Sequence, residues 1–439
     1  MPLKQTHSKI VVILTVLLSG LPNVLVSIEA NAASSPLETK ILPIWDRTFG
    51  GSSGDSIRAI APSTAGGYLL AGLSASPVSG NKGTSPFGGL DAWVVKVDDE
   101  GNKQWEALYG GTDSDYFVSA EQTSDGGYIL GGSSASPPSG NKTTAFYGTG
   151  QGGGDLWVVK INGIGKKLWE RSFGGNDRDD MVAVRQLPDG GYVVAGWSRS
   201  GASGNKASLS FGHSDYWLIR LDSAGDKIWE KHYGGSLGEE LTGFIVTVDG
   251  GFVLGGLSQS GIEGNKTAPN HGEVTEDYWI VRTDPDGNII WDKTYGGTGR
   301  DWFGAVVQTT DGGYLLGGTS LSLSDGNKTV ANFGNGDCWV VRIDSGGGVL
   351  WDKAYGGNST DYLFAILPTP DGGFLLGGNS TSPVSGNKTS PWLSASLGIG
   401  DIPDVWIVKT DANGDKSGEQ VFGGLHWDFL YSMVTGSGD

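Results

Sequence analysis

The chain has 439 residues, a formal net charge of −18 and one cysteine. A protein this acidic, with no basic cluster, repels nucleic acid and anionic lipid surfaces, and one cysteine excludes an internal disulfide. Its 76 glycines recur at fixed offsets beside aromatic and branched residues, which indicates turns and close packing rather than disorder.

Residues 1–32 have the pattern of a secretory signal peptide. Lys4 and Lys9 form a basic start, residues 10–21 an apolar core, and the small residues 30–32 a cleavage site. A transmembrane anchor is the weaker alternative because the unbroken apolar run is too short to span a bilayer. The pattern predicts a secreted mature chain, residues 33–439, with no membrane association after cleavage.

A module of about 60 residues repeats along the remaining chain. Each module contains four short runs rich in aromatic and β-branched residues, separated by Asp-Gly-Gly turns, Asp-x-x-Gly turns and longer loops. A seventh, partial copy at residues 421–424 has Gly418 where a Trp would stand. The Trp that opens each Trp-x-x-x-aromatic-Gly-Gly run stands at Trp45, Trp105, Trp169, Trp229, Trp291 and Trp351. A fixed period with four strands per unit predicts a single closed all-β domain, a β-propeller.

The strand runs also predict how a blade is built. The Trp-Val-Val-Lys runs at 93–96 and 157–160 and the Trp-Ile-Val-Lys run at 406–409 should be buried on both faces between neighbouring blades. The Gly-Tyr-Leu-Leu-Gly-Gly run at 313–318 is expected to be the innermost strand, because only small residues fit where blades converge. A linear solenoid is disfavoured because its units are usually shorter.

Counting strands predicts six complete four-stranded blades, each beginning at a Gly-Gly-Tyr or Gly-Gly-Phe strand. An extra strand pair, residues 41–49 and 56–61, precedes the first blade. The pair is either an added N-terminal hairpin, the preferred interpretation, or half of a seventh, incomplete blade.

The run DYWIVRTD at 277–284, with WDKTYGG at 291–297 and TDGGYLLGG at 310–318, resembles kelch and quinoprotein-type propeller blades. It is more similar to a group of bacterial secreted repeat proteins, over roughly residues 44–434. The resemblance implies the propeller fold but no particular activity. Copper-radical enzymes with kelch propellers need a constellation of Cys, Tyr and His, whereas this chain has only Cys338 and histidines scattered across the units. Quinoprotein dehydrogenases would carry vicinal cysteines and a calcium site, and neither is visible in the sequence. We therefore expect no metal and no cofactor.

Alternate connections of an up-and-down blade emerge at the same end. The Gly-Gly-x-x-x-Asp loops and the long Ser-Gly-Asn-Lys loops should therefore share one face, the loop face, and the tight turns the other. Long loops on a rigid scaffold usually carry binding, so the loop face is the expected functional face.

Two charged sets recur in these loops. Either the acids form a ring of cation ligands or catalytic carboxylates, or each one fixes its own loop by accepting backbone N–H bonds or pairing with the nearby Lys. The second interpretation is favoured because chemistry needs only one or two carboxylates in special surroundings. The lysines are Lys82, Lys142, Lys206, Lys266, Lys328 and Lys388, and the acids are Asp55, Asp115, Asp179, Glu239, Asp301, Asp361 and Asp428.

Residues that break the repeat are better candidates for binding, because exposed aromatics beside polar groups stack on sugars or anchor protein partners. The candidates are Trp302, Trp427, Trp392, Trp197, Tyr116, Tyr362, Arg178 and Arg300. They predict a monomeric, non-catalytic propeller that binds a polysaccharide or a protein. The alternative is a carbohydrate-active hydrolase or lyase, for which Glu239 and Glu240 are the only adjacent acid pair of the required kind.

Overall fold

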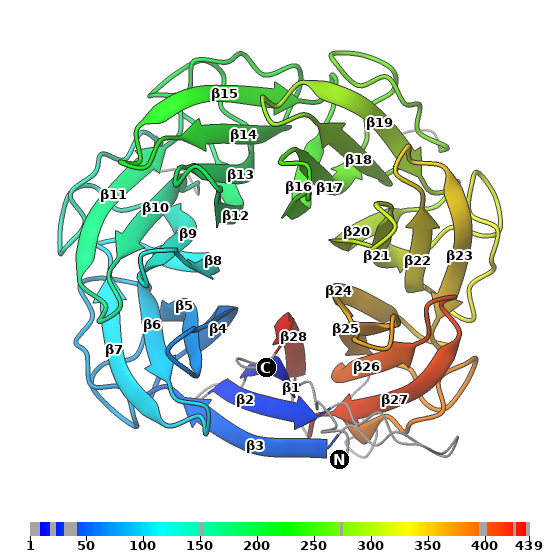
Figure 1. Cartoon of the computed structure of the whole chain (residues 1–439), viewed down its shortest axis with the longest axis horizontal. Coiled ribbons are helices and arrows are strands. Elements are labelled where there is room, and N and C mark those ends of the chain that lie inside the picture. Colours follow the sequence, from blue (N-terminus) through cyan, green and yellow to red (C-terminus); the bar gives the residue numbers. More distant parts are fainter. Residues whose placement is uncertain are drawn as a thin grey trace, which may run out of the picture.

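The computed structural model describes residues 9–17, 23–29, 42–149, 153–272, 275–394, 402–424 and 427–435. These residues form seven four-stranded antiparallel sheets around a central opening, the architecture of a β-propeller (Figure 1). Within these ranges no helix has the length and hydrophobicity that a membrane-spanning helix requires.

Six of the sheets are blades made of four strands that are consecutive in the chain, which is the predicted number. Each blade begins one strand earlier than predicted, at the strand that precedes the Gly-Gly-Tyr or Gly-Gly-Phe strand. Blade 1 comprises β4 (Asp55–Pro62), β5 (Tyr68–Ser74), β6 (Asp91–Val97) and β7 (Lys103–Tyr109). Blade 2 comprises β8 (Asp115–Gln122), β9 (Tyr128–Ser134), β10 (Asp155–Ile161) and β11 (Lys167–Phe173). Blade 3 comprises β12 (Asp179–Gln186), β13 (Tyr192–Ser198), β14 (Asp215–Leu221) and β15 (Lys227–Tyr233). Blade 4 comprises β16 (Glu239–Val246), β17 (Phe252–Ser258), β18 (Asp277–Thr283) and β19 (Ile289–Tyr295). Blade 5 comprises β20 (Asp301–Gln308), β21 (Tyr314–Ser320), β22 (Asp337–Ile343) and β23 (Val349–Tyr355). Blade 6 comprises β24 (Asp361–Pro368), β25 (Phe374–Ser380), β26 (Asp404–Thr410) and β27 (Lys416–Phe422).

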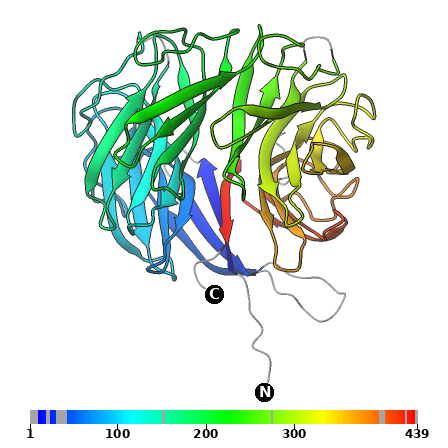
Figure 2. The ribbon, with the colours of Figure 1, turned by 45° about the horizontal axis from the view of Figure 1, so that its top comes forward.

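The seventh sheet, which we call the closing sheet, joins the two ends of the chain (Figures 1 and 2). Its order is β28 (Trp427–Thr435), β1 (Lys9–Leu17), β2 (Asn23–Glu29) and β3 (Leu42–Phe49). The extra strand pair of the sequence is therefore divided: β3 is the outer strand of the closing sheet, and β4 is the inner strand of blade 1. Two strands of this sheet come from the segment with signal-peptide character, whereas Lys4 and the expected cleavage site at 30–32 lie outside the described residues.

The prediction of the innermost strand was wrong. The Gly-Tyr-Leu-Leu-Gly-Gly run begins just before β21, the second strand of blade 5, and the inner strands are β4, β8, β12, β16, β20, β24 and β28 (Figure 1). The glycines are needed for a different reason. A Cβ at Gly318 would lie 2.1 Å from the carbonyl oxygen of Trp302 on the inner strand, and one at Gly317 would lie 2.3 Å from Leu363 of the next blade. Close approach between strands and between blades, not convergence on the axis, excludes side chains here.

The third strand of every blade is buried along its whole length, as the Trp-Val-Val-Lys runs predict. Each such strand buries a tryptophan in the packing between blades; the six are Trp93, Trp157, Trp217, Trp279, Trp339 and Trp406. The outer strands add links between blades, because the Tyr109 hydroxyl donates to the Gly165 carbonyl of the following blade at 2.6 Å and Tyr233 does the same to Gly287 at 2.7 Å. The blades are thus closely packed against one another, and the loops project from this ring.

Candidate functional site on the loop face

The two longer loop types meet at one end of each blade. In blade 2, the backbone N–H of Gly110 donates to the side-chain oxygen of Asn141 at 3.0 Å, and that of Thr112 donates to the hydroxyl of Ser139 at 3.0 Å. Asn141 and Ser139 belong to the long loop, and Gly110 and Thr112 to the Gly-Gly-x-x-x-Asp loop. Each long loop is thereby tied to the loop that leads into its own blade.

The recurrent acids stabilise these loops by accepting hydrogen bonds from them. The Asp115 carboxylate accepts from the backbone N–H of Gly111 at 2.8 Å and from the Ser136 hydroxyl at 2.7 Å, and the residue is completely buried. Glu239 takes the same place in blade 4, accepting from Gly235 N–H at 2.8 Å and from the Ser258 hydroxyl at 2.8 Å. One of the two acids considered for catalysis is thus already engaged in loop structure.

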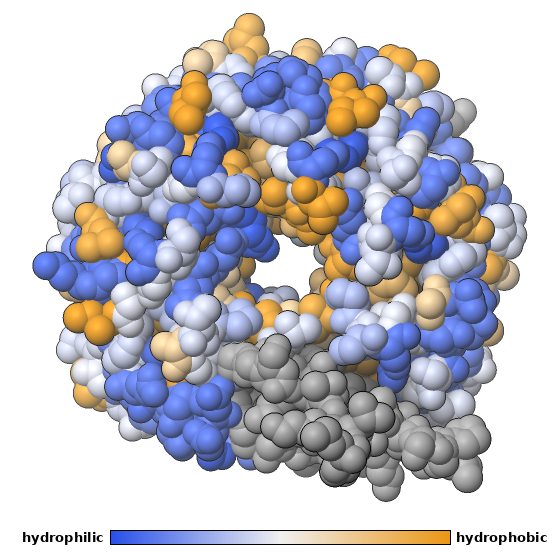
Figure 3. Space-filling view, in the orientation of Figure 1, coloured by the Kyte–Doolittle hydropathy of each residue, from blue (hydrophilic) through white to orange (hydrophobic). Residues whose placement is uncertain are grey.

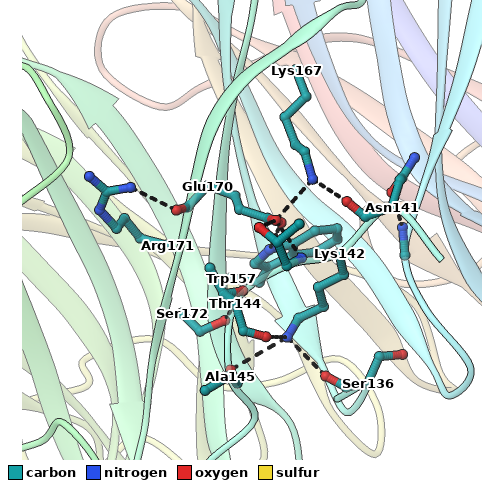
Figure 4. A network of polar contacts seen from close by, with 12 residues as sticks. Ser136, Asn141, Lys142, Thr144, Ala145, Trp157, Lys167, Glu170, Arg171 and Ser172 are labelled. Carbon is teal, nitrogen blue, oxygen red and sulfur yellow. Dashed lines mark hydrogen bonds and ion pairs between the residues drawn. The ribbon is translucent and has the colours of Figure 1, made fainter. Parts of the chain in front are cut away.

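The recurrent lysines are buried as well, and their contacts are to backbone carbonyls rather than to the acids. Figure 4 shows these contacts for Lys142. The Lys142 ammonium donates to the carbonyls of Ser136 and Thr144, both at 2.8 Å, and to that of Ala145 at 3.4 Å. Burial lowers the pKa of Lys142, and it lowers that of Lys266 to about 8. An exposed Lys–Asp ion pair, one of the alternatives in the sequence, does not occur among the described residues of these two sets.

A second buried carboxyl stands at the start of each third strand. Burial, with a smaller contribution from the neighbouring Asp361, raises the pKa of Asp337 to about 7, although a hydrogen bond from the Phe333 N–H opposes the shift. Its Oδ1 has no hydrogen-bond partner within the described part of the chain. The folded state therefore favours the protonated form of this carboxyl.

This carboxyl predicts a pH dependence that one substitution can isolate. Because the folded pKa lies above the ordinary value of about 3.9, folding takes up a proton, and stability contributed by Asp337 is lost as pH rises from about 4 to about 7. Asp337→Asn carries no charge. We expect the melting temperature of the variant minus that of the wild type to rise across this pH range and then level off; a difference independent of pH would contradict the assignment.

Inner strands bring aromatic side chains of blades 5 and 6 and the closing sheet to the central channel. Trp302 stacks on Tyr362 with ring centroids 6.5 Å apart, and Tyr362 on Phe364 at 6.0 Å. On β28, a second series runs from Trp427 through Phe429 to Tyr431, with centroids 5.8 and 6.5 Å apart. Hydrophobic side chains appear at several points around the opening (Figure 3). We call these six residues the aromatic arc.

The opposite wall, formed by blades 2 to 4, carries charge. Arg178 pairs with Asp180 at 2.5 Å, and Arg199 pairs with Glu240 at 3.3 Å. Both guanidinium groups also cover the ring of Trp197, at 5.1 and 5.4 Å from its centroid. Trp197 is only 7% exposed, so it acts as a support for the two arginines rather than as a free surface.

Two cavities open beside the channel on the loop face. One of about 430 Å³ is lined by Tyr362, Phe364, Trp427 and Phe429 of the aromatic arc together with neutral polar residues such as Asn335 and Thr360. The other, of about 580 Å³, lies between blades 2 and 3 and is lined by Tyr116, Arg178 and Asp180, among others. The Tyr116 hydroxyl donates to Asp180 at 3.3 Å across the two blades.

The predicted binding residues are therefore only partly brought together. Tyr362 and Trp427 line one cavity, Tyr116 and Arg178 the other, and Trp302 stacks against the first. Trp392 lies apart: its indole N–H donates to the Ile402 carbonyl at 2.8 Å within its own long loop, and it lines neither cavity. Arg300 is exposed and pairs with Glu276.

Sequence reasoning missed Arg58, Phe364 and Tyr431. Each is the fourth residue counted from the recurrent acid of its inner strand, which is Asp55, Asp361 or Asp428. The half-buried, alternating pattern of the inner strands could have identified this position once the inner strand was known.

Within the described ranges, no group of three or more His, Cys, Asp and Glu side chains could hold a metal ion. No protein-family model matches the chain. Over 320 residues the chain is 26% identical to regulatory protein FlaEY of Caulobacter vibrioides, an alignment that covers 65% of this chain and 32% of that protein. The chain thus spans about a third of the length of this relative.

Solved structures with a similar fold are distant. The cobalt-substituted apocarotenoid oxygenase of Synechocystis has a TM-score of 0.46 and 9% identity, covering 98% of this chain and 92% of that one. Sqt1 of Chaetomium thermophilum has a TM-score of 0.40 and 11% identity, covering 82% and 70%. The Pan2 WD40 domain of Neurospora crassa has a TM-score of 0.35 and 11% identity, covering 68% and 69%. Similarities of this size assign no function.

Proposed function

We propose that this protein is a secreted, non-catalytic propeller that binds a polysaccharide at the axial end of its loop face. The aromatic arc carries the proposal: six aromatic side chains from three neighbouring sheets border one channel, and four of them line a cavity with neutral polar groups. Aromatic faces are suited to stacking on sugar rings, and amide and hydroxyl groups to hydrogen bonding with sugar hydroxyls. Export is proposed from the pattern of residues 1–32.

The exposure of the arc supports a binding role. Trp427 is 47% exposed, Phe364 41% and Tyr431 38%, although large aromatic side chains usually pack when no ligand covers them. The wall with Arg178, Trp197 and Arg199 favours a second candidate, a protein partner, because Trp and Arg are enriched among residues that dominate protein–protein affinity. A hydrolase is less favoured, because Glu239 is engaged with the loop backbone and Glu240 with Arg199.

We expect Trp427→Ala and Tyr362→Ala each to weaken binding to a glycan by about 1–3 kcal/mol, as truncation of aromatic anchors does elsewhere. Binding would be measured first on an array of neutral and acidic polysaccharides and then by calorimetry with the best ligand. Phe87→Ala is the matched control, because Phe87 is 41% exposed in a loop of the same face and lines neither cavity.

Unchanged affinity in both arc variants would place the binding site elsewhere. Absence of any glycan binding by the wild-type chain would overturn the proposal and leave the protein partner as the candidate.

A further inference from the structure

Arg58 lies on the channel wall, outside the aromatic arc on which the proposed function rests. It lies on β4, the inner strand of blade 1, and is half-buried. Its guanidinium carbon is 5.1 Å from the ring centroid of Tyr116 in blade 2 and 5.9 Å from that of Tyr431 in the closing sheet. Since it reaches both neighbouring sheets, the side chain lies across the channel side of blade 1.

This guanidinium has no acidic partner among the residues that the structure describes. Its Nε–H is buried and donates to no acceptor within the described part of the chain, and the guanidinium forms no ion pair there. The other arginines of the inner wall are all paired: Arg178 with Asp180, Arg185 with Glu121, and Arg199 with Glu240. An unpaired cation is unexpected in a chain with a net charge of −18, where acids outnumber bases.

The physical cost of this arrangement points to a ligand. A buried donor without a partner carries an uncompensated desolvation penalty. Stacking on two aromatic rings offsets part of the cost and fixes the plane of the guanidinium. A planar, preoriented guanidinium is the group that best matches a carboxylate, because two of its N–H groups can donate to the two carboxylate oxygens.

The two rings that hold Arg58 also connect it to both cavities. Tyr116 lines the cavity between blades 2 and 3, and Tyr431 continues through Phe429 to Trp427 at the cavity of the aromatic arc. A polymer that stacks on the aromatic arc and extends past Tyr431 would therefore reach Arg58, which lies beside that ring.

We propose that the polysaccharide bound at this site is acidic, that its uronic-acid carboxylates are recognised by Arg58, and that Tyr116 and Tyr431 hold the guanidinium for this contact. The inference rests on the proposed function and names the class of its ligand. Other cations near the channel are neutralised by their own acids, so Arg58 alone supplies the preference for a negative charge.

The test compares polymers that differ only in charge. Oligomers of polygalacturonate and polymannuronate, each as the free acid and as the methyl ester, are titrated against the full chain by calorimetry. We expect at least one free acid to bind at least tenfold more tightly than its ester. Arg58→Gln should abolish this difference while leaving the affinity for the ester unchanged, and Arg58→Lys should restore only part of it. The melting temperature of each variant confirms that the fold is retained.

Arg300→Gln is the matched control, because Arg300 is exposed and paired with Glu276. Equal affinities for acid and ester in the wild type, a preference that survives in Arg58→Gln, or binding of neutral glycans alone would each overturn the inference while leaving the proposed function intact. Absence of binding to any acidic or neutral glycan would overturn both.

Discussion

A chain that begins at residue 33 is expected to unfold at a much lower temperature than the full chain. Without residues 9–29, β28 loses the pairing with β1 and β3 loses the pairing with β2, and the two strands no longer belong to one sheet. Leu430 and Met433 of β28, which are buried against blade 6, would keep that packing but lose the support of the β1 pairing. Losing several buried side chains at about 1.5–3 kcal/mol each corresponds to a shift of about 10 °C or more.

Deleting residues 1–8 alone is the control, because none of these residues belongs to a described strand. Equal melting temperatures of the full chain and of the chain from residue 33 would contradict the role of β1 and β2 in closure. The comparison also bears on the proposed export, since cleavage after residue 32 would remove the strands that complete the closing sheet.

The closing sheet differs from the blades at one register position. In each blade the first acid of the inner strand faces a serine of the second strand, as Asp301 faces Ser320, whereas Asp428 faces Val16. Burial raises the pKa of Asp428 to about 6, with the neighbouring Asp404 acting in the same direction. The N-terminal strand thus supplies backbone pairing without the serine that the repeat provides elsewhere.

Asp301→Ala is expected to destabilise the protein by about 3 kcal/mol, because hydrogen bonds to a charged group contribute about 1.5–3 kcal/mol each. Asp301 is completely buried and accepts from the Gly297 N–H at 3.0 Å and from the Ser322 hydroxyl at 2.7 Å. Substitution leaves both donors buried and unpaired. Lys328→Met in the same blade should cost a similar amount, since its ammonium donates to the Ser322 carbonyl at 3.0 Å and to that of Val330 at 2.6 Å.

Urea denaturation followed by tryptophan fluorescence measures both effects. Arg300→Ala serves as the control, because an exposed ion pair contributes only about 0.2–1 kcal/mol. Losses in Asp301→Ala and Lys328→Met no larger than that of the control would mean that the two residues form dispensable surface contacts.

The sequence by itself determined the repeat, the four strands of each unit and the propeller. These follow from local features, because Asp-Gly-Gly turns, Trp-Val-Val-Lys runs and a fixed period act within one unit and its neighbours. It also placed the two longer loop types on one face, since alternation of strand direction is sufficient for that. The burial of the third strands was predictable for the same reason, because a continuous apolar run has no polar face that could be exposed to water.

Only the tertiary structure decided which strand is innermost and which side chains meet at the axis. The two edges of an isolated four-stranded unit are not distinguished by its turns, so a choice based on glycine content failed for residues 313–318. The meeting of Arg58, Tyr116 and Tyr431 depends on ring closure, which brings the first blade beside the last strand of the chain. Residues so far apart in sequence share no local pattern, because their contact exists only once all the blades have packed.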